Sequence, residues 1–200
     1  MSNRKEKGEA IIIFLVLLVL FFIIAFLFGE NEEENITNSS SDTYTLMVYM
    51  CGSDLESDGG YASEDIEEML EAQLAKEVNL LVYTGGTTEW KNESIASNRN
   101  QVFKIEDNKL NLVKDDIGMK YFSKPETLIE FMNWAKDNYP ANKYGLILWD
   151  HGGGAVSGFG FDENETDKNE SLTIDEIKTA LDKFEPKLEF NVKVTVFGSH

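Results

Sequence analysis

The sequence is poor in the residues that metal and disulfide chemistry requires. It contains a single cysteine, Cys51, and two histidines, His151 and His200. One cysteine excludes an internal disulfide framework and any Cys-x-x-Cys metal motif, and two histidines outside a His-Glu-x-x-His motif offer no zinc centre. The Gly-x-x-x-x-Gly-Lys-Ser/Thr phosphate loop is also missing. We therefore expect no resident metal or cofactor.

Basic residues are scarce as well. The 18 lysines and arginines compare with 36 aspartates and glutamates, so the formal net charge is -18 at pH 7. A surface of this sign repels nucleic acid and anionic lipid headgroups and attracts cationic ligands. We therefore expect no nucleic-acid partner, and we interpret most of the charge as that of a solvated extracellular surface.

Residues 10–28 depart from this polarity, because they form an apolar run without a charged residue or a helix breaker. As a helix the run would be about 28 Å long, close to the thickness of about 30 Å of a bilayer hydrocarbon core. Basic residues precede the run and acidic residues follow it, and basic flanks stay in the cytoplasm. A cleaved signal peptide is the alternative, but its apolar core is usually about 7–15 residues long and ends at a small-residue site that is poor here. The pattern predicts a single-pass protein of the cell membrane, with a cytoplasmic tail (1–9), a transmembrane anchor (10–28), a flexible acidic linker (29–42) and an extracellular domain (43–200).

From residue 43 onward, strand-like and helix-like patterns alternate. Apolar runs bounded by turn residues predict strands, and apolar stripes at helical spacing predict helices. The expected elements are strands 44–50, 78–83, 144–149 and 191–197, helices 62–76 (capped by Ser63), 125–138 and 173–184, and a hairpin of 101–105 with 110–113 off the main sheet. This order predicts an α/β fold, a three-layer sandwich on a mostly parallel sheet. Four strands leave the far edge of the sheet unfinished, so we expect an incomplete domain.

The most informative segment is YGLILWDHGGG, at residues 144–154. A buried strand here would deliver His151 to the carboxyl edge of the sheet, where open α/β folds carry their reactive groups. Histidine titrates near neutral pH and suits general-base catalysis, and the N–H of Gly152 is a candidate to stabilise an oxyanion. Asp150 is interpreted as structural, because neighbouring strand residues point to opposite faces. Lipase oxyanion loops share His-Gly-Gly-Gly, but they need a Gly-x-Ser-x-Gly elbow that this sequence lacks.

Two further features suggest chemistry and have simpler explanations. Cys51 follows the first expected strand and would share a sheet edge with His151, which makes it a possible nucleophile. We favour its interpretation as a small buried residue, the usual role of a free cysteine. Residues 162–173 loosely resemble a calcium loop, but they lack glycine at the sixth position and glutamate at the twelfth. We interpret this segment as an acidic surface loop with at most weak calcium binding.

Four segments taken together resemble the clostripain family of cysteine peptidases, which belongs to the caspase-like superfamily. They are MVYMCGSDLES (47–57), SEDIEEML (63–70), LILWDHGGG (146–154) and SLTIDEIKTAL (171–181). The resemblance covers residues 43–197 and implies a caspase-hemoglobinase fold. It assigns the histidine of the catalytic dyad to His151, and it implies polypeptide substrates that are cleaved after Arg or Lys.

The sequence departs from the family where the second catalytic motif is expected. The family places Asp-Ala-Cys after a hydrophobic strand, and here that strand is followed by Gly198, Ser199 and His200. His200 therefore occupies the nucleophile position, and Gly198 replaces the aspartate that helps to select a basic side chain. The resemblance thus implies the amino-terminal part of a membrane-anchored endopeptidase without the expected nucleophile. The alternative is a catalytically inactive pseudopeptidase or gene fragment that acts at most as an anchored binding module.

Overall fold

The computed structural model describes residues 42–152, 158–166, 171–186 and 188–195, which belong to one compact unit. The expected cytoplasmic tail, the anchor and nearly all of the linker lie outside the described residues. Among the helices that are described, none is both long enough and apolar enough to cross a membrane.

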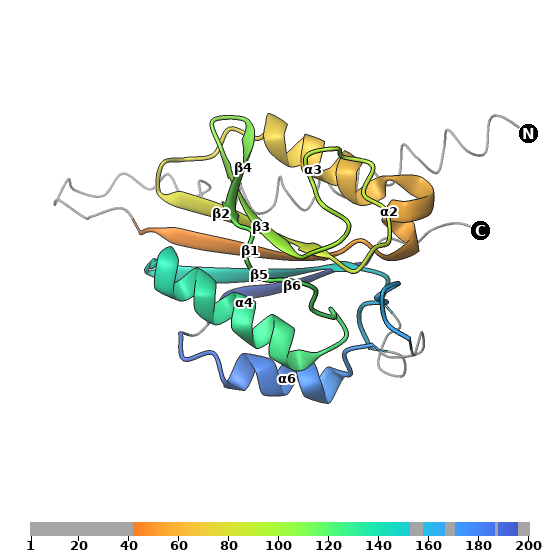
Figure 1. Ribbon diagram of the computed structural model, residues 1–200. Helices are drawn as coiled ribbons and strands as arrows, with labels where there is room; N and C mark the ends of the chain where they lie inside the picture. The colour runs from red at the N-terminus through yellow and green to blue at the C-terminus, as the bar shows by residue number, and fades with distance from the viewer. Residues whose placement is uncertain (1–41, 153–157, 167–170, 187, 196–200) are drawn as a thin grey trace, which may run out of the picture. The chain divides into compact units, whose positions relative to one another are not determined.

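A six-stranded sheet in the order β4-β3-β2-β1-β5-β6 forms the centre of the domain (Figure 1). Three neighbouring strand pairs are parallel (β1–β2, β1–β5 and β5–β6) and two are antiparallel (β2–β3 and β3–β4), so the sheet is mixed. The strands are β1 (Tyr44–Cys51), β2 (Val78–Gly85), β3 (Gln101–Glu106), β4 (Lys109–Lys114), β5 (Lys143–Asp150) and β6 (Leu188–Thr195). All four strands expected from the sequence are present, with ends shifted by a few residues.

Helices cover both faces of the sheet, as Figure 1 shows. The helices are α2 (Ser53–Gly59) and α3 (Tyr61–Glu71) on one face, and α4 (Pro125–Asn138) and α6 (Ile174–Asp182) on the other. The α2–α3 face is packed around Val48, Met50 and Trp149. The α4–α6 face is packed around a cluster of aromatic rings in which Tyr49 and Phe122 lie 4.3 Å apart, centroid to centroid. The three layers agree with the expected architecture.

The expected position of the hairpin is wrong, because the hairpin belongs to the main sheet. β3 pairs antiparallel with β2, and Leu80 lies opposite Ile105. Phe103 and Ile105 pack on the α2–α3 face, whereas Val102 packs on the other face, because successive strand residues point to opposite sides. The hairpin therefore covers the free edge of β2 and contributes to both cores.

The first helical region also differs from expectation, since the expected helix 62–76 is preceded by α2 and ends at Glu71. Gly60 closes α2 and opens α3 with a left-handed φ of 71°, a conformation that glycine adopts without strain. Ser63 lies inside α3 and does not cap it. By contrast, α6 begins where expected, because the side chain of Thr173 accepts a hydrogen bond from the backbone N–H of Glu176 in a capping box.

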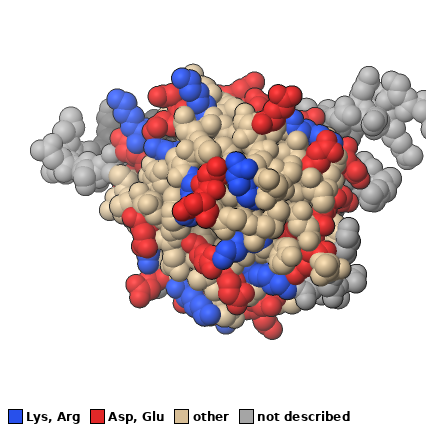
Figure 2. Space-filling view, viewed as in Figure 1, with Lys and Arg blue, Asp and Glu red and all other residues tan. Residues whose placement is uncertain are grey.

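Charged side chains of both signs are interspersed on the face shown in Figure 2. Some of the aspartates and glutamates of the described residues form ion pairs with lysine or arginine, as in Arg99–Asp115 at 2.6 Å and Lys114–Asp116 at 2.5 Å. Exposed pairs of this kind contribute little stability individually. On this face of the described residues, neither sign of charge forms a large uninterrupted patch.

Candidate active site

His151 directly follows β5, at the carboxyl edge of the sheet. β5 runs parallel to β1, with Met50 opposite Trp149, so residues 52–54 leave the sheet at the same edge. The His151 side chain is 37% exposed, which leaves the ring accessible to a substrate. The structure thus places His151 at the sheet edge where the sequence predicted it, next to the turn that follows Cys51.

Asp54, in the first turn of α2, holds the His151 ring. Its Oδ1 lies 2.9 Å from Nε2 of His151, and its side chain is 43% exposed. Asp54 was not among the site residues predicted from the sequence. Its position in the sequence could have indicated it, because Asp54 follows β1, and β1 lies parallel to and beside β5, which ends next to His151.

Asp150 is buried and does not bond to the ring. Its Oδ1 accepts hydrogen bonds from Ser53 Oγ at 2.7 Å and from the His151 backbone N–H at 2.5 Å, and its Oδ2 accepts one from the Phe161 backbone N–H at 2.7 Å. Burial raises the pKa of Asp150 to about 6, and these hydrogen bonds limit the rise by favouring the charged form. The geometry supports the structural role predicted for this residue.

Ser53 adopts an uncommon backbone conformation between β1 and α2. It is fully buried, and its φ of 48° lies in the left-handed region that residues other than glycine rarely occupy. A non-glycine residue stays in such a conformation only when its surroundings hold it there. The hydrogen bond from Ser53 Oγ to Asp150 provides that hold and fixes the direction in which α2 starts.

Cys51 is packed in the core at the end of β1. The residue is 0% exposed, and its Sγ donates a hydrogen bond of 3.5 Å to the carbonyl oxygen of Phe161. Burial raises the pKa of the thiol well above its ordinary value, and the nearby carboxylates of Asp150 and Asp162 raise it further. A side chain at Gly86 would collide with Sγ, so this glycine closes the pocket around the sulfur. The geometry therefore supports the interpretation of Cys51 as a buried residue.

Gly152 continues from His151 and pairs with a neighbouring loop. It forms an isolated antiparallel bridge with Phe159, which in turn bridges to Leu172. These contacts place the loop before Asp162 beside the end of β5. The role of Gly152 in stabilising an oxyanion remains a prediction, and residues 153–157 lie outside the described residues, as do Gly198 and His200.

The segment expected to be an acidic surface loop is anchored inward, so this expectation is wrong for residues 162–165. Asp162 is buried, and its carboxylate accepts from the backbone N–H groups of Phe122 at 2.8 Å and Asn164 at 2.9 Å. Glu163 accepts from Ser57 Oγ at 2.9 Å and from the Thr88 backbone N–H at 2.8 Å.

Glu165 completes this anchoring. It accepts a short hydrogen bond from Ser123 Oγ and pairs with Lys124 Nζ at 2.9 Å. The carboxylates of this loop thus bond to donors of the protein itself. Within the part of the chain that the structure describes, no group of three or more His, Cys, Asp or Glu side chains is placed to hold a metal ion.

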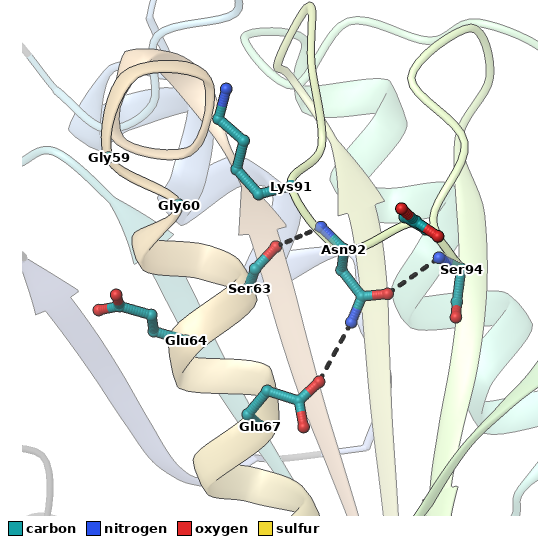
Figure 3. Close-up of a pocket in the computed structure, with 9 residues that line it drawn as sticks. Gly59, Gly60, Ser63, Glu64, Glu67, Lys91, Asn92 and Ser94 are labelled. Atoms are coloured by element: carbon teal, nitrogen blue, oxygen red, sulfur yellow. Dashed lines mark hydrogen bonds between the residues drawn. The ribbon is translucent and has the colours of Figure 1, made fainter.

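A cavity of about 520 Å³ opens between the start of α3 and residues 91–94 of the loop that follows β2 (Figure 3). Its polar walls bond to one another: the Asn92 backbone N–H donates to Ser63 Oγ at 2.9 Å, and Asn92 Oδ1 accepts from the Ser94 N–H at 2.9 Å. Neither His151 nor Asp54 lines it. The lining residues are Gly59, Gly60, Ser63, Glu64, Glu67, Lys91, Asn92, Glu93 and Ser94.

Two solved structures of cysteine proteases have a similar fold. The chain matches a secreted C11 cysteine protease from Bacteroides thetaiotaomicron in complex with an irreversible peptide inhibitor, with a TM-score of 0.54 and 19% identity, over 76% of this chain and 42% of that chain. It also matches an inactive zymogen C11 protease from Parabacteroides distasonis, with a TM-score of 0.54 and 23% identity, over 78% of this chain and 42% of that chain. These likenesses show the fold.

The sequence comparisons agree with the fold. Clostripain from Hathewaya histolytica is 28% identical over 143 residues, which are 62% of this chain and 27% of that protein. The chain therefore spans about a quarter of that relative's length and less than half the length of the two proteases. The model of the clostripain family matches residues 48–197, which include the second half of β1, Asp54 and His151. The chain thus belongs to the clostripain family.

Proposed function

We propose that this chain carries the histidine part of a membrane-anchored cysteine endopeptidase that cleaves polypeptides after Arg or Lys. The observation that carries the proposal is the position of His151, half-exposed at the carboxyl edge of β5 with Asp54 on its Nε2. Membership of the clostripain family supports the reaction class. The apolar run at residues 10–28 supports the anchor, with the domain outside the cell.

The proposed substrates are polypeptides with basic side chains. The protease family supports polypeptides, and the net charge of -18 favours cationic ligands. The solved structure from Bacteroides thetaiotaomicron is in complex with an irreversible peptide inhibitor, which agrees with the proposal of a peptide substrate. The choice of Arg or Lys rests on the family resemblance.

In the proposed reaction, His151 moves the proton of a cysteine thiol. The ring takes this proton while the sulfur forms a bond to the scissile carbonyl carbon, and the negative charge on the carbonyl oxygen is stabilised by backbone N–H groups, including that of Gly152. The ring then gives the proton to the leaving amine nitrogen as the C–N bond breaks. Water hydrolyses the resulting thioester.

A second candidate function is that of an anchored pseudopeptidase. The family resemblance favours it: by that resemblance His200 stands where the family has its nucleophilic cysteine, and Gly198 where it has the preceding aspartate. The buried thiol of Cys51 with its raised pKa is a poor substitute. We therefore expect the 200-residue chain alone to lack useful activity.

The test compares the 200-residue chain with a fusion in which residues 1–197 are joined to the carboxyl-terminal part of a clostripain relative that begins with Asp-Ala-Cys. Both are assayed with fluorogenic peptides that carry Arg, Lys or Ala before the scissile bond. We expect no turnover by the chain alone, and turnover of the Arg and Lys peptides by the fusion. His151→Ala should reduce that turnover at least about 100-fold, as the loss of a general base does.

Three results would contradict the proposal. Equal cleavage of the Ala peptide would remove the basic specificity, and a fusion unaffected by His151→Ala would remove the assigned role of this histidine. Turnover by the unfused chain, abolished by both Cys51→Ala and His151→Ala, would make Cys51 the nucleophile. A folded fusion without any turnover would favour the pseudopeptidase.

A further inference from the structure

Two hydrogen bonds join the turn after β1 to the end of β5. Ser53 bonds to Asp150, and Asp54, the next residue, bonds to His151, which follows Asp150. The first bridge is buried, whereas the second is half-exposed. Asp150 Oδ1 also accepts a hydrogen bond from the His151 backbone N–H at 2.5 Å. The Asp150 carboxylate therefore links the backbone of His151 to Ser53, the residue before Asp54.

This arrangement controls the direction of the Asp54 side chain. The left-handed φ of Ser53 turns the chain sharply at the start of α2, and Ser53 Oγ holds that turn on Asp150. Asp54 is therefore directed at Nε2 by a backbone conformation that the protein maintains against its intrinsic preference. Such strain is consistent with a site that requires a fixed geometry.

The chemistry of the pair decides which ring nitrogen carries the proton. An ionised carboxylate can only accept hydrogen bonds, and a neutral imidazole has one N–H donor and one acceptor nitrogen. With Asp54 Oδ1 at 2.9 Å, Nε2 must be the donor, which leaves the lone pair on Nδ1. Within the described residues, this is the only hydrogen bond that the ring makes.

We propose that Asp54 is the positioning residue of the site: it holds His151 in the Nε2–H tautomer, so that Nδ1 is the nitrogen that takes up the proton. This inference deepens the proposed function and rests on it for the identity of the proton donor, a cysteine thiol. Ser53 and Asp150 act one step further away, by holding Asp54 in place.

The test reads the tautomer of His151 directly, without peptide hydrolysis. The full chain is labelled with ¹⁵N-histidine, kept in detergent micelles and studied by long-range ¹H–¹⁵N spectroscopy at pH of about 8.5, where imidazole is mostly neutral. His200→Gln identifies the signals of His151. We expect one tautomer in the wild type, with a protonated Nε2 and an unprotonated Nδ1.

Two variants remove the acceptor-only group. Asp54→Ala deletes the carboxylate, whereas Asp54→Asn replaces it with an amide that can donate as well as accept. Because Asp54→Asn keeps the volume of the side chain, it is the variant that is expected to disturb folding less. Both should shift the ¹⁵N signals to the intermediate values of mixed tautomers. The matched control is Asp58→Asn, an exposed carboxylate of the same helix, which should leave the tautomer unchanged. A wild-type ring that is already mixed or carries its proton on Nδ1 would overturn the proposal, as would Asp54 variants that keep the wild-type spectrum.

The activity of the fusion provides an independent measurement. Asp54→Asn should lower kcat by about 10–100-fold and leave KM for Arg peptides within about twofold, because it disturbs the base and not substrate binding. A raised KM with an unchanged tautomer would instead make Asp54 a carboxylate that binds the basic side chain of the substrate, which would overturn the positioning role. An inactive fusion contradicts the proposed function alone, since the spectrum still decides the role of Asp54.

Discussion

Trp149 and Asp150 are adjacent in β5, and their side chains lie on opposite faces of the sheet. On the Trp149 face, the carboxylate of Asp65 accepts a single hydrogen bond, from Trp149 Nε1 at 2.5 Å. On the other face, Asp150 accepts hydrogen bonds from one hydroxyl and two backbone N–H groups. Burial raises the pKa of both acids to about 6.

The two carboxyl groups therefore have similar pKa values but differ in the number of hydrogen-bond donors that their charged forms accept from. Asp65 has the acidic side chains of Glu64 and Glu68 as neighbours, and their charges disfavour its ionisation further. Asp150 is instead surrounded by donors that would lose their partner if the carboxylate were removed. We therefore expect folding to depend on the buried carboxylate of Asp150 and not on that of the partly buried Asp65.

The largest expected effect is that of Asp150→Asn. The amide places an NH₂ group against at least one of the N–H or O–H donors that the carboxylate accepted. We expect the free energy of unfolding at pH 7 to fall by about 2–4 kcal/mol, since buried donors lose a charged acceptor. A urea titration followed by tryptophan fluorescence measures the change. Asp58→Asn is the control and should stay within about 0.5 kcal/mol of the wild type, as exposed substitutions do. A similarly small loss for Asp150→Asn would remove the contrast between the faces.

Asp65→Asn should act in the opposite direction. The amide oxygen still accepts from Trp149 Nε1, and no charge has to be buried. We expect the free energy of unfolding at pH 7 to rise by about 1 kcal/mol. The same urea titration tests this expectation, and a loss of stability would mean that the charged form of Asp65 is required.

The pH dependence sharpens this second prediction. Between about pH 4 and 6 the folded protein holds a proton on Asp65 that the unfolded chain has released, because the pKa in the fold is raised from 3.8 to about 6. This contribution to stability is present below about pH 4 and is lost as the pH rises through 6. The fall in unfolding free energy between pH 4 and 7 should therefore be smaller in Asp65→Asn by about 1–2 kcal/mol, and the remaining slope should contain the contribution of Asp150. Identical slopes in the two proteins would show that Asp65 does not titrate as inferred.

The smallest expected effect concerns calcium at the loop that holds Asp162, Glu163 and Glu165. These carboxylates, like that of Asp150, already accept hydrogen bonds from the protein. We expect binding no tighter than about 1 mM, so 1 mM calcium should shift Tm by less than about 2 °C. A micromolar dissociation constant from calorimetry that is lost in Asp162→Ala would contradict this prediction.

Much of the fold follows from the sequence because its elements are locally encoded. Residues 44–50 and 144–149 are apolar runs ended by turn residues, and α4 begins at a proline, so periodicity alone locates them. α2 escaped detection because it is a seven-residue helix between glycines and has no apolar stripe. The pairing of the hairpin with β2 was missed because strand neighbours depend on contacts between distant residues, which no local pattern contains.

In the candidate active site, too, the residues identified by a local sequence pattern were predicted, and those defined by distant contacts were not. His151 was located from its own strand and the glycines that follow it, all within one short segment. Its partner Asp54 is 97 residues away, and the inward anchoring of Asp162 depends on Phe122, 40 residues away. An acidic segment such as 162–165 looks exposed from its composition, and only the tertiary structure provides the donors that allow it to be buried.

The order of strands in the sheet also sets when this site can form during synthesis. Tyr44 of β1 pairs with Val78 of β2 and with Lys143 of β5, and closing the longer loop costs roughly 1 kcal/mol more in chain entropy. At an elongation rate of about 5–20 residues per second, β2 reaches β1 several seconds before β5 is made. Both bridges to the histidine strand span 97 residues, so neither can form before that strand has joined β1. The orientation of His151 is therefore a late product of folding, because a nascent chain that contains Asp54 but not yet β5 has neither the base to orient nor the Asp150 carboxylate that holds Asp54.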